Sequence, residues 1–314
     1  MAEKPLIRIV THDGPFHADD VVAVAILAKL FPDHQIIRSR DPDILEMADF
    51  LVDVGGVYDH DSRKYDHHMQ EPPKDRNNHL FSSAGLIWNH YSREYLRKIK
   101  IPKEYTFKDR TIDLVDKVDK LIETKWIYPI DRNDNGVSTG PTAISELISA
   151  MNPVDVEKSR KSFDRQFMQA VSMVSHLFER ACFHAADSTI TKLAYMAAEK
   201  QKLSEDRILF VDAEVGQFGD FSVSPVHFVI YPTWDYLNNH HDYIIRPIYR
   251  CEDKQYKTQI PTYLFGLERK ALEDLGFPGI AFIHHTGFKV KVDDKQTAID
   301  FCERLLAQEI NPKI

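Results

Sequence analysis

The chain has 314 residues, of which 43% are hydrophobic and 28% are charged, and its formal net charge is −8. This length and balance predict a globular protein with enough apolar residues for two cores. No run of about 18 apolar residues is present, so no membrane span or membrane partner is expected. The acidic balance argues against a protein that grips long duplex nucleic acid. A short or terminal strand stays compatible with it, because bound metal cations invert the local field.

The start of the sequence has neither a signal-peptide core nor an Arg/Ser-rich transit segment, because residues 1–5 lead directly into a strand-like run. We therefore expect a cytoplasmic protein, or one whose leader lies outside this sequence. The three cysteines are far apart, which excludes a disulfide framework and a CxxC zinc site. They are expected to be small, buried apolar residues: Cys182, Cys251 and Cys302.

Strand and helix signals alternate over residues 6–150. Apolar runs predict strands at 6–10, 35–38 and 50–54. Apolar periodicity predicts helices at 19–31, 42–48, 82–98 and 105–125. This β-α-β-α order predicts a mostly parallel sheet flanked by helices. Ligands of such sheets bind beyond the carboxyl ends of the strands.

The remainder of the chain changes character twice. Residues 153–203 contain no glycine and predict helix nearly throughout. Beyond them, runs separated by Gly, Pro and Asn predict strands at 208–211, 226–231 and 243–249, and helices at 264–275 and 296–307. The fold class is therefore α/β. We expect an α/β domain at 1–150, a helical connector at 151–205 and a second, smaller α/β domain at 206–314.

Histidines and carboxylates gather at three places that each follow a predicted strand. They are His12, His17 and Asp19 in the first loop, Asp53 after the third strand, and Asp66, His67 and His68 beyond it. These are the ligand types that Mn, Fe, Zn or Mg use when they act on phosphoesters. Because the carboxyl ends of parallel strands meet at one edge of the sheet, the pattern predicts one site built from three loops.

Structural interpretations compete with this one. An acid at a helix start commonly caps the helix, which accounts for Asp20 but not for two histidines in the same loop. Asp53 suits a turn, or its two oxygens bridge two metals. His67 and His68 are adjacent and point in different directions, so at most one faces a given metal. Asp66 is placed to orient a ring, which leaves His68 to meet a phosphoryl oxygen.

A fourth candidate is the acidic segment 131–136, which turn chemistry alone predicts to be a loop. Beside the first three groups it would supply a further acidic ligand, either Asp131 or Asp134. Rival chemistries lack their motifs: the sequence contains no GxGxxG, GxxxxGKS, GxSxG or HExxH. Catalysis by metal-activated water is the leading hypothesis.

Five ordered blocks carry a family resemblance that spans nearly the whole chain. They are TH-x-G-x-FH-x-D (Thr11 to Asp19), VDVGG (Val52 to Gly56), YDHH (Tyr65 to His68) with SSAGLI (Ser82 to Ile87), ID-x-x-DNG (Ile130 to Gly136) and F-x-H-x-x-GF (Phe282 to Phe288). The blocks resemble the DHH phosphoesterase superfamily and, more closely, the melanocyte-proliferating-gene family, which is regarded as a 3′–5′ RNA exonuclease. The chain departs from that family at Ala18 and Asp20, where Cys and Glu are usual; neither is a required ligand in this interpretation.

The resemblance implies a two-domain enzyme, with a DHH-like metal-binding catalytic domain at 1–150 and a C-terminal substrate-binding domain at 206–314 across a cleft. It implies two divalent ions, manganese first and magnesium as the alternative. Their implied ligands are His12, His17, Asp19, Asp53, His67 and one or both of Asp131 and Asp134. Asp53 would bridge the ions, and His68 would donate to the phosphoryl oxygen as charge develops.

The second domain would hold the substrate. His284, which lies in the last matching block, and Arg246 are the candidates for a phosphate clamp; Arg246 is chosen only for its position before Pro247 in a predicted strand. Gly287 would let the backbone approach a phosphate closely, and Phe288 is a candidate for stacking on a base, with a core position as its other interpretation.

Three functions compete at this point. The leading one is a metal-dependent exonuclease acting on RNA or short oligonucleotides. A small-molecule phosphatase or pyrophosphatase would use the same site. A catalytically silent nucleotide-binding protein is the third, and the intact ligand set weighs against it. The sequence leaves open the metal, the cleavage polarity and whether the chain forms a homodimer.

Overall fold

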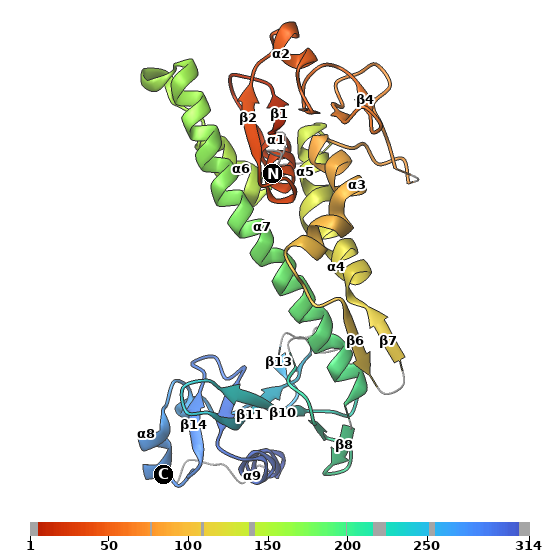
Figure 1. Ribbon diagram of the computed structural model, residues 1–314. Coiled ribbons are helices and arrows are strands. Elements are labelled where there is room, and N and C mark those ends of the chain that lie inside the picture. The colour runs from red at the N-terminus through yellow and green to blue at the C-terminus, as the bar shows by residue number, and fades with distance from the viewer. Residues whose placement is uncertain are drawn as a thin grey trace. The chain divides into compact units, whose positions relative to one another are not determined.

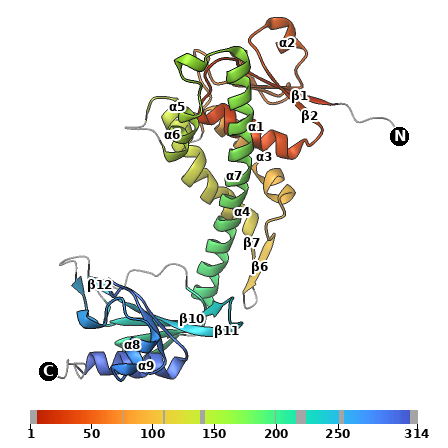
Figure 2. The same ribbon diagram turned by 90° about the vertical axis from the view of Figure 1, so that its left-hand side faces the viewer.

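The structure, a computed structural model, describes residues 6–75, 77–107, 110–137, 142–198, 200–215, 224–250 and 255–307. The chain divides into two compact units, Met1–Thr106 with Thr111–Thr189, and Phe107–Arg110 with Ile190–Ile314. Each unit combines a sheet with helices and has its own hydrophobic core, which confirms the α/β fold class (Figures 1 and 2). The three-part domain division at 1–150, 151–205 and 206–314 stays a prediction.

A five-stranded sheet forms the centre of the first unit. Its strands are β1 Ile7–Thr11, β2 His34–Arg38, β3 Phe50–Val52, β4 Tyr58–Asp59 and β5 Lys64–Tyr65. The strand order is β2-β1-β3-β5-β4, and every pairing is parallel except that of β4 with β5. The mostly parallel sheet is thereby confirmed. The chain leaves β1, β3 and β5 at the same edge, where the candidate ligands follow.

Helices cover both faces of this sheet. They are α1 Ala18–Leu30, α2 Pro42–Glu46, α3 Ser83–Lys98, α4 Leu114–Ile122, the π-helix η1 Glu123–Ile127, α5 Tyr128–Asp134, α6 Ala143–Ala150, the 3₁₀ turn η2 Asp155–Glu157 and α7 Arg160–Ala197. α1 is apolar nearly all round and lies buried between β1, β3, α3, α5 and α6. Short α2 covers the opposite face, where Val10 and Leu51 pack against Ile44 and Leu45.

The long helix α7 completes the core of the first unit. Figure 1 shows its first part running beside the other elements of that unit. Four of its buried side chains recur at helical spacing: Phe167, Val171, Val174 and Phe178. Trp88 of α3 meets Phe178 edge-on at 5.3 Å between ring centroids. Cys182 also lies in this core, and Cys302 lies in the core of the second unit, both as buried free thiols. Cys251 falls outside the described residues.

The second unit contains a mixed sheet of order β14-β15-β11-β10-β9-β8, in which only β9 and β10 are parallel. Its elements are β8 Lys200–Leu203, β9 Ile208–Val211, β10 Phe228–Asp235, β11 His240–Pro247, β12 Tyr249–Arg250, β13 Gln255–Tyr256, η3 Thr262–Leu264, α8 Arg269–Asp274, β14 Ile280–Ile283, β15 Val290–Val292 and α9 Lys295–Leu306. Along β10, Phe228 and Ile230 belong to the core that also contains residues of α8 and α9, whereas Val229 and Tyr231 face the other side of the sheet. Figure 2 shows α8 and α9 on the same side of this sheet.

Three expected elements were wrong. The segment 105–125 is helical only from Leu114; before it lie strands β6 Glu104–Phe107 and β7 Arg110–Asp113. Aromatic and β-branched residues favour strand there, and Asp113 caps the helix by accepting from the Val115 N–H at 2.8 Å. The helix expected at 264–275 begins only at α8. The acidic segment 131–136 is not a loop, because α5 runs to Asp134 and only the Asn135-Gly136 turn that ends it fits the prediction.

Candidate metal centre

The loop after β1 brings His12 to the carboxyl edge of the sheet. The His12 side chain is 5% exposed, and its Nε2 lies 3.2 Å from Asp20 Oδ2 and 3.3 Å from Asp53 Oδ2. Its Nδ1 lies 3.1 Å from the Asp13 carbonyl oxygen. That oxygen can accept a hydrogen bond from the ring only when Nδ1 carries a proton. In neutral His12 the Nε2 lone pair therefore points at two carboxylates.

Asp53 follows β3 and occupies the middle of the cluster. Its backbone has a φ of 56°, the left-handed region that costs a non-glycine residue of the order of 1–3 kcal/mol. The Asp53 N–H donates to the Tyr65 carbonyl at 3.0 Å, and Oδ1 accepts from Ser83 Oγ at 3.0 Å. These contacts hold the strained residue so that Oδ2 faces His12 and Oδ1 faces His67, which lies 3.3 Å away through its Nε2.

His67 joins Asp53 to acids from two helices. Its Nε2 lies 3.0 Å from Asp134 Oδ2 at the end of α5 and 3.8 Å from Asp19 Oδ2 in the first turn of α1. His17 is exposed and belongs with Asp19 and Asp134 to a second group whose ligand atoms all lie within 4.8 Å of one another. The structure therefore brings together the residues expected from all of the first three loops.

His68 takes a different direction from His67. Its side chain is 64% exposed, and its Nδ1 lies 2.9 Å from Asp66 Oδ1 and 3.5 Å from Asp53 Oδ1. Asp66 is buried, and its Oδ2 accepts from the Gly56 N–H at 2.5 Å. The ring that Asp66 orients is thus the ring of His68, and a proton held at Nδ1 by Asp66 leaves Nε2 of the neutral ring as an acceptor.

Asp131 is turned away from the cluster although it is also fully buried. Its Oδ1 accepts from the Ser82 N–H at 3.0 Å and from Ser82 Oγ at 2.6 Å, and its Oδ2 lies 3.3 Å from His79 Nε2. None of the three-ligand groups formed by the described residues includes Asp131. Of the two acids that the sequence left open, the geometry favours Asp134.

Two residues at the site escaped the sequence interpretation. Ser83, the first residue of α3, donates through Oγ to Asp53 and through its backbone N–H to Asp19 Oδ2 at 3.3 Å. The start of α3 thus supplies hydrogen bonds and its dipole to the acids of the cluster. Asp20 has one oxygen beside His12. The signals were the SSAGLI block and the adjacent acids 19–20, both of which had sufficient explanations as helix starts.

The pKa values of the cluster are shifted because several acids and only a few imidazoles are buried together. Burial lowers the pKa of His12, but the Asp20 and Asp53 carboxylates outweigh it and raise the pKa to about 10. His67 reaches a pKa of about 10 in the same way through Asp134 and Asp53. Burial, and next the charge of Asp53, raise the pKa of Asp19 well above its ordinary value. Burial raises the pKa of Asp53, but the hydrogen bonds and charges of His12 and His67 outweigh it and hold that pKa below the ordinary range.

Three buried atoms of the cluster lack a hydrogen-bond partner among the described residues: Asp19 Oδ1, Asp20 Oδ2 and His67 Nε2. They lie close to other ligand atoms without the geometry of a hydrogen bond. Buried polar atoms are normally paired, because an unpaired one costs roughly 1–3 kcal/mol and more when charged. A divalent cation that displaces the imidazole protons would give these atoms a partner, and nitrogen with carboxylate oxygen suits manganese. The donor set therefore fits the metals expected from the sequence.

In the second unit, His284 of the predicted phosphate clamp lies on the turn between β14 and β15, and Arg246 lies on β11. His284 Nδ1 accepts from the Thr286 N–H at 3.2 Å, so neutral His284 carries its proton on Nε2. The Phe288 ring lies 4.2 Å from the ring of His284 and 4.7 Å from the Arg246 guanidinium carbon. Gly287 has a φ of 70°, and a Cβ there would lie 2.6 Å from Phe265. The close approach of Phe265 is therefore sufficient to require glycine at position 287, and no ligand is needed to explain it. That the turn faces the metal ligands stays a prediction.

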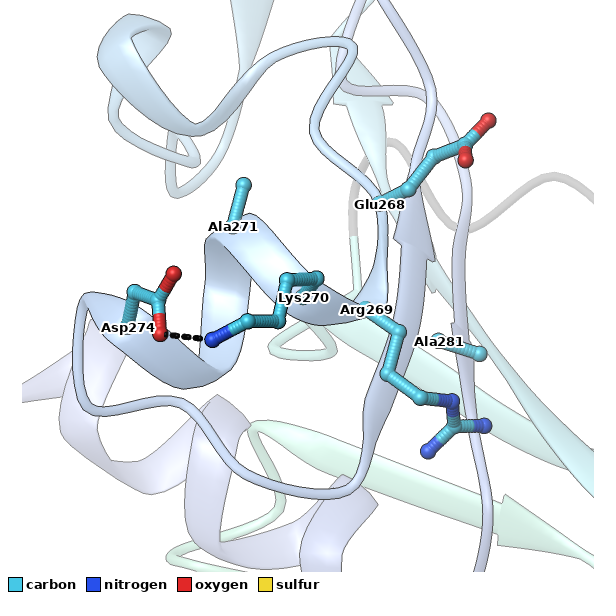
Figure 3. A pocket seen from close by; sticks show the side chains of 6 residues that line it. All are labelled: Glu268, Arg269, Lys270, Ala271, Asp274 and Ala281. Carbon is cyan, nitrogen blue, oxygen red and sulfur yellow. Dashed lines mark hydrogen bonds and ion pairs between the residues drawn. The ribbon is translucent and has the colours of Figure 1, made fainter.

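Two other features of the second unit do not make a site. Asp235, His240 and Asp242 lie within ligand reach of one another, but Lys291 Nζ already pairs with Asp242 at 2.6 Å and Asp235 at 3.0 Å. An open pocket of about 560 Å³ lies beside α8 (Figure 3). Its cations are paired as well, Lys270 with Asp274 at 2.5 Å, as the dashed line marks, and Arg269 with Asp293.

Fold and site together define an α/β protein with a buried carboxylate–imidazole cluster at the carboxyl ends of parallel strands. Such clusters are typical of centres that hold divalent cations. Among the helices of the described residues, none combines the length and the apolar character needed to cross a lipid bilayer.

The chain belongs to the uncharacterised protein family UPF0160, whose family model, MYG1_exonuc, matches residues 8–306. The MYG1 protein C694.04c of Schizosaccharomyces pombe is 29% identical, over 90% of this chain and 92% of that protein. The MYG1 exonuclease of Mus musculus is 28% identical, over 97% of this chain and 86% of that protein. The resemblance to the melanocyte-proliferating-gene family is thereby confirmed, and named members of the family include exonucleases.

The solved structures that are similar over most of the chain include one phosphodiesterase. It is a pGpG-specific phosphodiesterase from Vibrio cholerae, which covers 97% of this chain and 99% of its own with 13% identity and a TM-score of 0.30. A likeness at this level carries no conclusion about fold or function.

Proposed function

We propose that the chain is a metal-dependent phosphodiester hydrolase, a 3′–5′ exonuclease acting on RNA or short oligonucleotides. The observation that carries the proposal is the position of Asp53. Its two oxygens face two different imidazoles, His12 at 3.3 Å and His67 at 3.3 Å, in a site with unpaired buried acceptor atoms. A carboxylate between two groups of ligands is what a two-ion hydrolase requires. The exonuclease name of relatives supports the same reaction class.

The residues that would hold two ions, manganese or magnesium, are His12, His17, Asp19, Asp53, His67 and Asp134. When bound, the ions would supply a water of lowered pKa and positive charge beside the phosphoryl oxygens. The protein contributes preorganisation: Ser83 and the left-handed backbone fix Asp53, and the start of α3 fixes Asp19. Residues that are held in this way need little rearrangement during the reaction.

His68 is the residue proposed to meet the phosphoryl oxygen. It is exposed while its neighbours in the cluster are buried, and Asp66 fixes its ring. A hydrogen bond to phosphate requires the protonated imidazolium, because neutral His68 with its proton on Nδ1 offers only an acceptor at Nε2. Asp66 accepts from Nδ1 in that form and leaves the Nε2–H to donate, so the pair resembles other carboxylate–imidazole donors to anions.

The second unit is proposed to bind the strand next to the scissile phosphate. His284, Arg246 and Lys289 gather there, and burial together with the Arg246 and Lys291 charges lowers the pKa of Lys289. Like charges that destabilise one another favour an anion between them. His284 would donate from Nε2 to a phosphate, and Phe288 would offer its remaining face to a base.

The experiment uses the purified full chain with Mn²⁺ or Mg²⁺ and four substrates: 5′-labelled RNA, 5′-labelled DNA, a dinucleotide and pyrophosphate. Metal-dependent shortening of RNA from its 3′ end, seen as a ladder of labelled products, is expected. Asp53→Asn should abolish turnover. Asp113→Asn makes the same substitution at the N-cap of α4, outside the cluster, and should leave turnover unchanged. Fast pyrophosphate hydrolysis without cleavage of any oligonucleotide would instead assign a small-molecule phosphatase.

The substrate surface has its own test. His284→Ala should raise KM for an RNA oligomer much more than KM for a generic aryl phosphodiester, because the clamp holds a group beside the scissile phosphate. His285→Ala, one residue away, is the matched control and should affect neither. Equal losses on both substrates would argue against the clamp. The proposal also includes the cytoplasmic location expected from the sequence, which fluorescence microscopy of a C-terminally tagged chain would test.

A further inference from the structure

The two oxygens of Asp20 have different environments, although the side chain is fully buried. Oδ1 accepts from the His17 N–H at 3.0 Å and from the Val21 N–H at 2.7 Å, which is the hydrogen bonding of a helix cap. Oδ2 has no hydrogen-bond partner among the described residues and lies 3.2 Å from His12 Nε2. The cap therefore uses only half of this carboxylate.

Capping does not require the second oxygen. Asp20 is the fourth residue of a capping box that begins at His17, and an uncharged Gln also serves at that position without burying a charged atom. A buried charged oxygen without a partner destabilises the fold unless a ligand binds it. His12 does not supply a hydrogen in its neutral form, because its proton lies on Nδ1 beside the Asp13 carbonyl. Protonated His12 is a counterion of this carboxylate in the metal-free chain, but its Nε2 lacks the geometry of a hydrogen bond to Oδ2. A divalent cation that displaces the ring proton would be offered lone pairs by Asp20 Oδ2, His12 Nε2 and Asp53 Oδ2.

We infer that Asp20 is a metal ligand of this centre and, with His12 and Asp53, holds one of the two divalent cations. The three ligand atoms lie within 4.8 Å of one another, and all three residues are buried. His67 and Asp134 lie on the other side of Asp53 and would serve the second ion. Asp20 then has two functions: Oδ1 fixes the start of α1, and Oδ2 binds the ion. This inference rests on the proposed function and adds a ligand to it.

The test is calorimetric titration of Mn²⁺ into the metal-free full chain. Asp20→Asn keeps an oxygen for the cap and replaces the charged Oδ2 by an amide of similar size. It should weaken Mn²⁺ binding at one of two sites by at least about 10-fold, because even loss of a partner to a ligand costs about 10–100-fold. Asp20→Glu restores a carboxylate and should recover more affinity than Asn. Asp113→Asn makes the same change at a cap without a metal nearby, and should bind as wild type.

The outcomes separate the inference from the proposed function. Wild-type affinity and stoichiometry in Asp20→Asn would overturn Asp20 as a ligand, and would leave it as a cap and a counterion of His12. Failure of the wild-type chain to bind Mn²⁺ or Mg²⁺ would overturn the proposed function itself. Circular dichroism checks the fold of each variant. If Asp20→Asn does not fold, Asp20→Gln replaces it as an uncharged variant that suits this position of a capping box, and wild-type Mn²⁺ affinity in Asp20→Gln would contradict direct binding.

Discussion

We predict that replacing Gly85 by alanine destabilises the fold, because Asp131 occupies the space that a Cβ would need. Gly85 lies in the first turn of α3, and a Cβ built on it would lie 2.5 Å from both carboxylate oxygens of Asp131 and 2.8 Å from its Cγ. Asp131 cannot move away cheaply, because Ser82 donates to it from Oγ at 2.6 Å and from its N–H at 3.0 Å. Gly85→Ala must therefore displace either the start of α3 or the carboxylate.

The size of the effect follows from three terms. Forcing a methyl group into a packed site costs roughly 1–3 kcal/mol. Weakening a hydrogen bond to a buried charged group costs about 1.5–3 kcal/mol. Ala in place of Gly in a helix returns up to about 1 kcal/mol. The variant should lose about 1.5–6 kcal/mol of unfolding free energy. In an Asp131→Ala background the clash is gone, and the same substitution should be neutral or stabilising by up to about 1 kcal/mol.

Urea unfolding monitored by tryptophan fluorescence measures this cycle. The chain has three tryptophans, and Trp234→Phe leaves Trp88 and Trp126, which both lie in the first unit. The four proteins of the cycle should give a coupling free energy of at least about 2 kcal/mol. A cost below about 0.5 kcal/mol for Gly85→Ala, or an equal cost in both backgrounds, would refute the position assigned to Asp131.

Three further predictions concern the cluster itself. In metal-free protein the raised pKa values of His12 and His67 stabilise the fold. This stability is complete below about pH 6.5, the ordinary pKa of histidine, and is lost as the pH rises toward about 10. The midpoint of thermal unfolding should therefore fall over that range, and a constant or rising midpoint would contradict the titration. Asp134→Asn should weaken Mn²⁺ binding by at least about 10-fold in calorimetry, whereas Asp131→Asn should lower stability with little loss of affinity; the reverse order would exchange their roles. His68→Gln should lower kcat by about 10²–10³-fold at unchanged Mn²⁺ affinity, and a rise in KM alone would make it a binding residue.

The convergence of the site was predictable because it depends on topology. Apolar runs located β1 and β3, and parallel pairing made the loops after them meet at one edge, which brought His12 beside Asp53. Strong local signals also located α1, since Pro32 follows its apolar run. Neither inference required knowledge of side-chain packing.

Packing decided the features that the sequence left open. Asp131 and Asp134 lie three residues apart on α5, and only the contacts of Ser82 and His67 show which of them faces the cluster. The apolar spacing in 105–125 resembled one helix because β-branched residues before Asp113 share its period. Asp20 was missed because capping explains one of its oxygens, and only the structure shows that the other has no partner.

Anomalous diffraction from crystals grown with Mn²⁺ tests the central claim most directly. Two peaks are predicted in the first unit, one on each side of Asp53, with ligand distances of about 2.0–2.3 Å to nitrogen and oxygen atoms of the cluster. His12 should contact one ion and His67 the other, with Asp53 shared between them. A single ion that does not touch Asp53, or manganese bound only at Asp235, His240 and Asp242 in the second unit, would contradict a two-ion centre at this position.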